Sequence, residues 1–128
     1  MPKADAPEDC GRMVAEAVSS GDIEAVLSLY EPDAVFVVPR AFGEGSVTGT
    51  DALREAFNGL LAMSPQLAVQ VERTIASGDT ALLIGHWTLN GRDADGHDIE
   101  TGARFADIVR RQSDGSRRYV IDNPNGTD

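Results

Sequence analysis

The segment 103–111 constrains the fold more than any other part of the chain, because it predicts a strand with a carboxylate in its middle. Side chains of a strand alternate between its two faces, so Asp107 shares one face with the apolar Phe105 and Val109. An isolated charge in such a place is costly unless it is paired, hydrogen-bonded or neutralised by a raised pKa. Asp107 therefore needs a reason to be there, and a pocket against this face is one.

Composition excludes several kinds of partner. The chain has 128 residues, of which 21 are acidic and 11 basic, and its net charge is −10 at pH 7. So acidic a protein is a poor partner for nucleic acids and for anionic membrane surfaces. Cys10 is the single cysteine, which rules out an intrachain disulfide and fits a reduced, cytoplasmic protein. The length predicts one domain over residues 1–128, with an ordered core at about 7–124.

The order of helical and β patterns predicts the fold class. Apolar residues recur at helical spacing in the first half of the chain and at strand spacing in the second. The expected helices cover 8–20, 23–30 and 50–64, with Asp22 and Thr50 as caps of the last two. The expected strands cover 34–38, 67–75, 80–89, 99–111 and 119–122. This order predicts an α+β fold, in which the helices cover the concave face of a curved sheet.

Four short stretches carry a family resemblance: Gly21-Asp22-Ile23-Glu24-Ala25-Val26, residues 29–36, Val47-Thr48-Gly49 and residues 107–110. Together with the element order they resemble the nuclear transport factor 2-like superfamily, which includes ketosteroid isomerases and SnoaL-like polyketide cyclases. The resemblance covers residues 8–124. It implies a cone-shaped barrel of three N-terminal helices packed on a strongly curved, mostly antiparallel sheet, with one deep pocket. It also implies a homodimer formed through the sheet.

Ketosteroid isomerases offer a comparison residue by residue. Their general-base aspartate precedes the proline that ends the first strand, and that position is Val38 here. Their oxyanion-hole tyrosine on the first helix corresponds to Val14, and their protonated aspartate on the long strand corresponds to Asp107. That protonated aspartate is a known example of a carboxylic acid kept neutral by an apolar site. With one of three functional groups present, the resemblance argues against a standard ketosteroid isomerase.

Asp107 has two interpretations. It is a structural residue that accepts hydrogen bonds from a helix terminus or pairs with an arginine such as Arg104 or Arg12, or it is a pocket acid or base with a raised pKa. Asp122 presents the same choice, because alternation places it on the face of Val120, which the resemblance turns inward. Two carboxylates at one cavity can divide acid and base roles, whereas an Asn-Pro turn with a capping aspartate explains the same residues.

Aromatic residues predict the wall of the pocket. Trp87 is either floor packing or a platform for an aromatic ligand, and Gly85 beside it leaves room for a close approach. Tyr30 is expected on the second helix with its hydroxyl at the rim. The predicted ligand-binding residues are Trp87, Phe105, Phe36, Tyr30, Gly85, Val38, Val14 and Asn123.

The remaining motifs do not indicate a metal or a cofactor. His86 and His97 have no cysteine or helical partner at metal-ligand spacing. The glycine-rich segment 43–45 lacks the lysine and the strand-to-helix context of a phosphate loop. We therefore expect no metal ion and no cofactor.

These observations predict a protein that binds a small apolar or aromatic metabolite. If it is an enzyme, we expect a cofactor-free isomerase, cyclase or dehydratase that uses acid/base chemistry at Asp107 and Asp122. The alternative is a non-catalytic ligand-binding or dimerisation module in which both carboxylates are structural.

Overall fold

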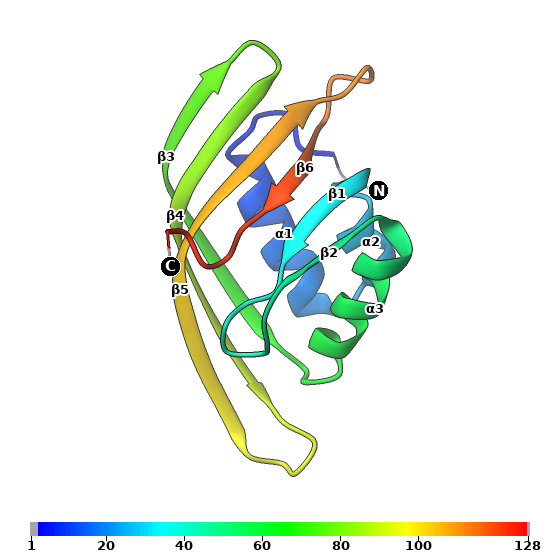
Figure 1. The fold of residues 1–128 in the computed structure, drawn as a ribbon, viewed down its shortest axis with the longest axis vertical. Coiled ribbons are helices and arrows are strands. Elements are labelled where there is room, and N and C mark those ends of the chain that lie inside the picture. Colours follow the sequence, from blue (N-terminus) through cyan, green and yellow to red (C-terminus); the bar gives the residue numbers. More distant parts are fainter. Residues whose placement is uncertain (1–2, 128) are drawn as a thin grey trace.

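The computed structural model describes residues 3–127 and shows a strongly bent sheet with three helices against its concave side (Figure 1). The helices are α1 (Asp9–Ser20), α2 (Ile23–Leu27) and α3 (Thr50–Leu61). The apolar stripe of α1 packs against β3. None of the helices in the described part of the chain is long and apolar enough to cross a membrane.

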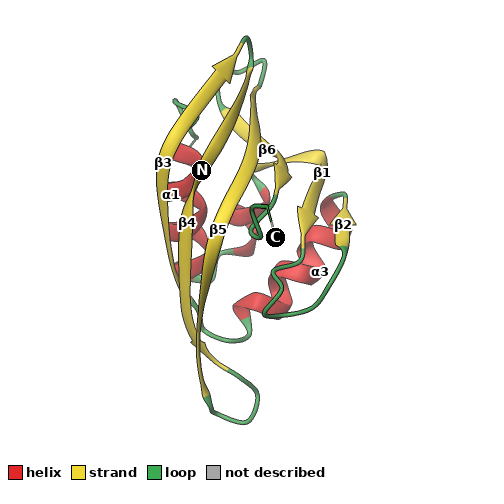
Figure 2. Cartoon of the chain, turned by 60° about the vertical axis from the view of Figure 1, so that its left-hand side comes forward, coloured by secondary structure: helices red, strands yellow, loops and turns green. Residues whose placement is uncertain are grey.

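Six strands form one mixed sheet in the order β2-β1-β6-β5-β4-β3 (Figure 2). All neighbours are antiparallel except β1 and β6, which run parallel. The strands are β1 (Tyr30–Val37), β2 (Ser46–Thr48), β3 (Gln66–Ser77), β4 (Thr80–Arg92), β5 (Asp98–Arg111) and β6 (Arg117–Asp122).

The predicted α+β class and the helices on a curved sheet are confirmed. The sheet is not closed, because β2 and β3 remain its two edges. The predicted cone-shaped barrel is therefore an open, bent sheet covered by helices. The described residues do not form a closed barrel.

The first strand is longer than its apolar run predicted. It begins at Tyr30, so the prediction that Tyr30 belongs to the second helix is wrong. The backbone N–H of Tyr119 donates to the carbonyl of Leu29 at 2.7 Å, and Tyr30 pairs with Tyr119 across the parallel β1–β6 ladder. This pairing with a distant strand overrides the helical spacing. The three-residue β2 was not predicted, since so short a strand has no readable period.

The caps agree with the sequence at one helix and differ at another. The carboxylate of Asp22 accepts the N–H of Ala25 at 3.1 Å and caps α2 as predicted. Thr50 is instead the first residue of α3, and its cap position is Gly49, whose φ of 92° lies in the region that favours glycine.

Residues before position 7 also pack against the sheet. Ala4 is fully buried, and its carbonyl accepts the N–H of Arg117 at 2.9 Å. Lys3 forms an ion pair with Asp114 at 2.8 Å. Met1, Pro2 and Asp128, which fall outside the expected ordered core, lie outside the described residues.

A β-bulge in β3 brings the backbone of that strand close to Gly85. Pairing with β4 shifts by one residue between Val71 and Arg73. A Cβ atom on Gly85 would lie 1.9 Å from the carbonyl oxygen of Gln70 and 2.9 Å from the ring of Phe105. Gly85 therefore makes room for the neighbouring strand and for Phe105, rather than for a ligand.

Replacing Gly85 by alanine is expected to destabilise the protein by about 2 kcal/mol or more, because the new methyl group overlaps a backbone carbonyl that cannot move freely. Gly59 is the matched control, since it lies on α3 with open space around it and Gly59→Ala should stabilise by up to about 1 kcal/mol. Urea unfolding of the two variants measures both effects. A Gly85→Ala protein as stable as the wild type would contradict this account of the bulge.

Candidate functional site

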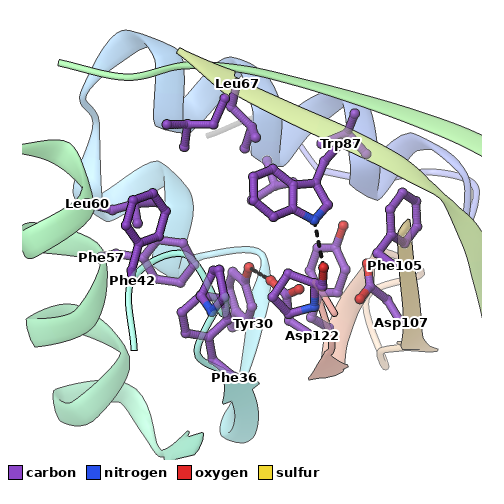
Figure 3. A pocket seen from close by; sticks show the side chains of 16 residues that line it. Tyr30, Phe36, Phe42, Phe57, Leu60, Leu67, Trp87, Phe105, Asp107 and Asp122 are labelled. Carbon is purple, nitrogen blue, oxygen red and sulfur yellow. Dashed lines mark hydrogen bonds between the residues drawn. The ribbon is translucent and has the colours of Figure 1, made fainter. Parts of the chain in front are cut away.

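A cavity of about 60 Å³ lies between the inner face of the sheet and the helices (Figure 3). Its lining is apolar and aromatic except for two carboxyl groups and the hydroxyls of two tyrosines. The residues that line it are Val14, Tyr30, Phe36, Pro39, Phe42, Phe57, Leu60, Leu67, Val69, Trp87, Leu89, Phe105, Asp107, Tyr119, Asp122 and Pro124.

Asp107 points into this cavity from the middle of β5 and is 4% exposed. One carboxyl oxygen, Oδ1, accepts the backbone N–H of Asn123 at 2.7 Å. The arginines considered as partners are engaged elsewhere: Arg104 pairs with Glu72 at 3.3 Å, and Arg12 pairs with Glu16 at 3.3 Å. The carboxyl group of Asp107 thus has a backbone donor from a turn instead of a balancing cation.

A β-bulge in β6 turns Asp122 toward the same cavity. Ile108 pairs with Ile121 but Val109 pairs with Tyr119, so Val120 is an extra residue in the ladder. Simple alternation would give Tyr119 and Asp122 opposite faces, whereas the bulge lets both line the cavity. The prediction that Asp122 faces inward therefore agrees with the structure, but the residue beside it is Tyr119, not Val120.

The two carboxyl groups lie close enough for each to shift the pKa of the other, so one proton can join Asp107 to Asp122. The hydroxyl of Tyr30 donates a hydrogen bond to Oδ2 of Asp122 (Figure 3). Burial raises the pKa of Asp107 well above its usual value, and the nearby negative charge of Asp122 raises it further. Burial also raises the pKa of Asp122 to about 6, although the hydrogen bonds from Tyr30 and Asp107 hold it down.

These directions indicate which carboxyl group holds a proton more tightly. The pKa of Asp107 is raised by burial and by the charge of Asp122, which favours its protonated form, while Asp122 accepts hydrogen bonds from Tyr30 and from Asp107. The pair then carries one proton and one negative charge next to an apolar space. It can donate a proton from one carboxyl group and accept one on the other, which is what acid/base chemistry requires.

The predicted aromatic wall is present. Val14, Phe36, Trp87 and Phe105 all line the cavity, and the rings of Phe36 and Phe57 stack with centroids 4.7 Å apart. The indole Nε1–H of Trp87 donates to the carbonyl of Pro124 at 2.8 Å (Figure 3). Trp87 therefore offers the cavity its ring face, while its polar edge holds the C-terminal segment 123–127.

Three predicted ligand-binding residues lie outside the lining. Gly85 is covered by Gln70 and Phe105, as described above. Val38 and Asn123 line a separate hollow beside the loop 39–45. The site role of Asn123 is indirect, because its N–H is the donor to Asp107.

The predicted site residues leave out nine residues of the lining. Six of them lie on regular elements, namely Phe57, Leu60, Leu67, Val69, Leu89 and Tyr119, and the other three come from irregular segments. Pro39 and Phe42 belong to the loop after β1, and Pro124 follows β6. The side chain of Asn125 joins these segments: its Nδ2–H donates to the carbonyl of Val38, and its Oδ1 accepts the N–H of Arg40, both at 3.1 Å. Loops lack the regular spacing that predicts which side chains face inward. Only the clustering of Pro, Phe and Asn in these segments could have indicated that they line the cavity.

The histidines do not join this site. His86 is half exposed on the outer face of the sheet and contacts Glu72 at 3.2 Å. His97 lies in the β4–β5 hairpin loop near Asp93 and Asp95. The carboxylate of Asp93 accepts the N–H groups of Asp95 and His97, each at 2.9 Å, which closes this loop.

Comparison with known proteins assigns the chain to a family. Residues 11–119 match the sequence model of the SnoaL-like domain. The chain belongs to the SnoaL-like domain family. The match spans most of the chain and confirms the resemblance to the nuclear transport factor 2-like superfamily. No curated protein matches the chain.

Solved structures share this SnoaL-like fold over nearly the whole chain. A provisionally named calcium/calmodulin-dependent protein kinase II association domain from Xanthomonas campestris is 18% identical and superposes with a TM-score of 0.79, covering 99% of this chain and 95% of its own. A provisionally named aromatic ring hydroxylase from Novosphingobium aromaticivorans is 25% identical, with a TM-score of 0.78 and coverage of 94% and 86%. A provisionally named dehydratase of the NTF2-like family from Streptomyces avermitilis is 18% identical, with a TM-score of 0.75 and coverage of 90% and 89%. These likenesses show the common fold.

The carboxyl pair makes a specific prediction for the pH dependence of stability. A carboxyl group whose pKa is raised by folding binds more protons in the native state, so its contribution to stability falls as pH rises through the folded pKa. In Asp107→Asn, the amide mimics the protonated acid, because it can donate to Asp122 and accept from Asn123. The free energy of unfolding of this variant relative to wild type should therefore increase from pH 4 to pH 8.

Urea unfolding at a series of pH values measures this difference. Asp95→Asn is the control for loss of one negative charge alone, because Asp95 is exposed on a hairpin loop. A difference between Asp107→Asn and wild type that stays constant or shrinks with pH would show that Asp107 is ionised in the native protein.

Proposed function

We propose that this SnoaL-like protein binds a small apolar or aromatic molecule in its cavity and acts on it by cofactor-free acid/base chemistry. The observation that carries the proposal is the pair of Asp107 and Asp122 at the wall of an otherwise apolar cavity. Such a pair keeps one proton close to a bound molecule and away from bulk water. Strongly perturbed carboxyl groups in a cleft are candidates for catalysis.

The chemistry that fits the pair is proton transfer next to a carbonyl group. The carboxylate of Asp122 accepts a proton from a C–H bond, and the electrons of that bond move to the carbonyl oxygen. The oxygen takes the proton that Asp107 held, so the pair as a whole keeps its proton count. Return of a proton to the same or a different carbon completes an isomerisation. In a dehydration the ligand carries a hydroxyl group on the β carbon, which leaves as water with the proton from Asp122, while the enol returns its O–H proton to Asp107 and the carbonyl re-forms.

The similar solved structures give only general support to this class of reaction. One structural relative is provisionally named a dehydratase and another an aromatic ring hydroxylase. The structural likeness therefore supports a pocket that accepts small molecules. The type of reaction has to be inferred from the site residues of this chain.

The size of the cavity favours the alternative, a non-catalytic module with structural carboxylates. The cavity measures about 60 Å³, whereas ligand pockets are typically about 300–1,000 Å³. A cavity this small holds on the order of two water molecules, so an aromatic ring can enter only if residues such as Phe42 or Leu60 move. The hydrogen bonds that Asp107 and Asp122 make also join β5, β6 and β1, which is a structural role in itself.

One experiment separates the two candidates. Trp87 is the only tryptophan, so its single indole N–H signal in an NMR spectrum reports on the cavity. Acetophenone should shift this signal, and its methyl protons should exchange with solvent deuterium faster in the presence of the protein. In Asp122→Asn, which removes the proton acceptor, we expect the protein-catalysed exchange to fall by about 100-fold.

Asp95→Asn serves again as the charge control and should keep the exchange rate of the wild type. Binding of acetophenone without exchange would favour the non-catalytic module. Absence of any shift of the Trp87 signal would contradict a ligand pocket for small aromatic molecules.

We also propose that two copies associate through the outer face of the sheet. An apolar row crosses five strands on that face, because Ile75 pairs with Leu82, Leu82 with Ile108, Ile108 with Ile121, and Ile121 with Val35. Ile75 is 44% exposed and Ile121 is 38% exposed, which makes them the most exposed large hydrophobic residues between residues 3 and 127. A contiguous apolar row of this kind is typical of an interface.

Ile121→Glu is expected to convert a dimer into a monomer without unfolding it, because the side chain points away from the core. Asn58→Glu adds the same charge to an exposed position of α3 and should leave the assembly unchanged. Sedimentation velocity measures both. A wild-type protein that sediments as a monomer at high micromolar concentration would contradict the proposal.

A further inference from the structure

Tyr119 occupies an unusual place in the cavity wall. It lies on β6 next to the bulge, is 1% exposed, and lines the cavity together with Asp107 and Asp122. Its ring stacks on that of Tyr30, with centroids 5.0 Å apart and planes at 24°. Neither composition nor alternation indicated a role for it.

The hydroxyl of Tyr119 makes no hydrogen bond to any residue between 3 and 127, whereas the hydroxyl of Tyr30 donates to Asp122. Within the same residues, every side-chain polar atom that is fully enclosed has a partner. The Tyr119 hydroxyl must therefore keep some contact with open space. Because the residue as a whole is almost completely buried and lines the cavity, that space is the cavity itself.

The backbone places this hydroxyl next to the carboxyl pair. Tyr30 and Tyr119 occupy paired positions on neighbouring strands and point to the same face, so their stacked rings extend side by side. Tyr30 reaches Asp122, so the Tyr119 hydroxyl lies at the same end of the cavity. Burial and the negative charges nearby raise the pKa of Tyr119 well above its usual value, which keeps the hydroxyl protonated and able to donate.

The other polar groups on the cavity are already engaged. The indole N–H of Trp87 donates to Pro124, the Tyr30 hydroxyl donates to Asp122, and Asp107 shares its proton with Asp122. In the ligand-free protein, Tyr119 is therefore the donor among the described lining residues that has no partner, whereas Asp107 gives its proton to the ligand only during the proposed reaction. A buried donor without a partner costs free energy, and a ligand oxygen would remove that cost.

We propose that the Tyr119 hydroxyl donates a hydrogen bond to an oxygen atom of the ligand, so that the cavity selects aryl ketones and related oxygen-bearing rings over hydrocarbons of the same shape. The proposal rests on the ligand pocket described under the proposed function. It adds a residue that determines specificity and a chemical class for the ligand.

Two probes of nearly equal shape test the selection. Acetophenone carries a carbonyl group where α-methylstyrene carries a C=CH₂ group, and binding of each is followed by the indole N–H signal of Trp87. Wild-type protein should bind acetophenone about tenfold more tightly, as expected for one additional hydrogen bond in a desolvated site. In Tyr119→Phe the affinity for acetophenone should fall to that for α-methylstyrene, whose own affinity should not change.

A second measurement uses the wild-type protein alone and does not depend on the folding of a variant. The ¹³Cζ signal of Tyr119 should shift when acetophenone binds and should not shift with α-methylstyrene. Equal affinity of the wild type for both probes, or equal loss of both in Tyr119→Phe, would overturn the role of Tyr119 while leaving the pocket in place. Failure of both probes to shift the Trp87 signal would instead overturn the proposed function, and this inference with it.

Discussion

The structure depends on the burial of two carboxyl groups side by side. Two carboxylates cannot both be ionised in so apolar a place without a large cost, and no cation among the described residues lies beside them. One proton retained on Asp107 lowers this cost. Asp107 also accepts the N–H of Asn123, and Asp122 accepts the hydroxyl of Tyr30 and the proton that it shares with Asp107. These bonds connect β5, β6 and β1, so the same interaction holds the strands together and gives the cavity its polar end.

The sequence allowed the fold and the position of Asp107 to be predicted, because both follow from periodicity. The helices, the long strands and the inward face of Phe105 and Asp107 follow from spacings of 3.6 and 2. What could not be predicted arises where that period breaks. The bulge at Val120 brings Tyr119 and Asp122 to one face, and no local signal marks a residue that the partner strand leaves unpaired.

The part of the cavity wall that irregular segments form could not be predicted from the sequence either, for a different reason. Pro39, Phe42 and Pro124 lie on irregular segments, and their positions depend on hydrogen bonds between residues far apart in the chain, above all those of Asn125 to the loop after β1. For an aromatic ring to enter, lining residues such as Phe42 on this loop or Leu60 on α3 have to move, and the cost of that movement lowers the observed affinity of the ligand.

The distribution of polar groups over the cavity also separates this chain from a ketosteroid isomerase. Val14 places an apolar side chain on the helical wall where that family has a hydroxyl, and Val38 lies outside the cavity where that family has its base. Here the polar groups come from the sheet, on β1, β5 and β6. Proton donors and acceptors gathered on one wall can act on only one edge of a bound molecule. To shift a double bond along a ring, the carbon that loses a proton and the carbon that gains one must therefore both face that wall. This requirement restricts the possible ligands more than the fold alone does.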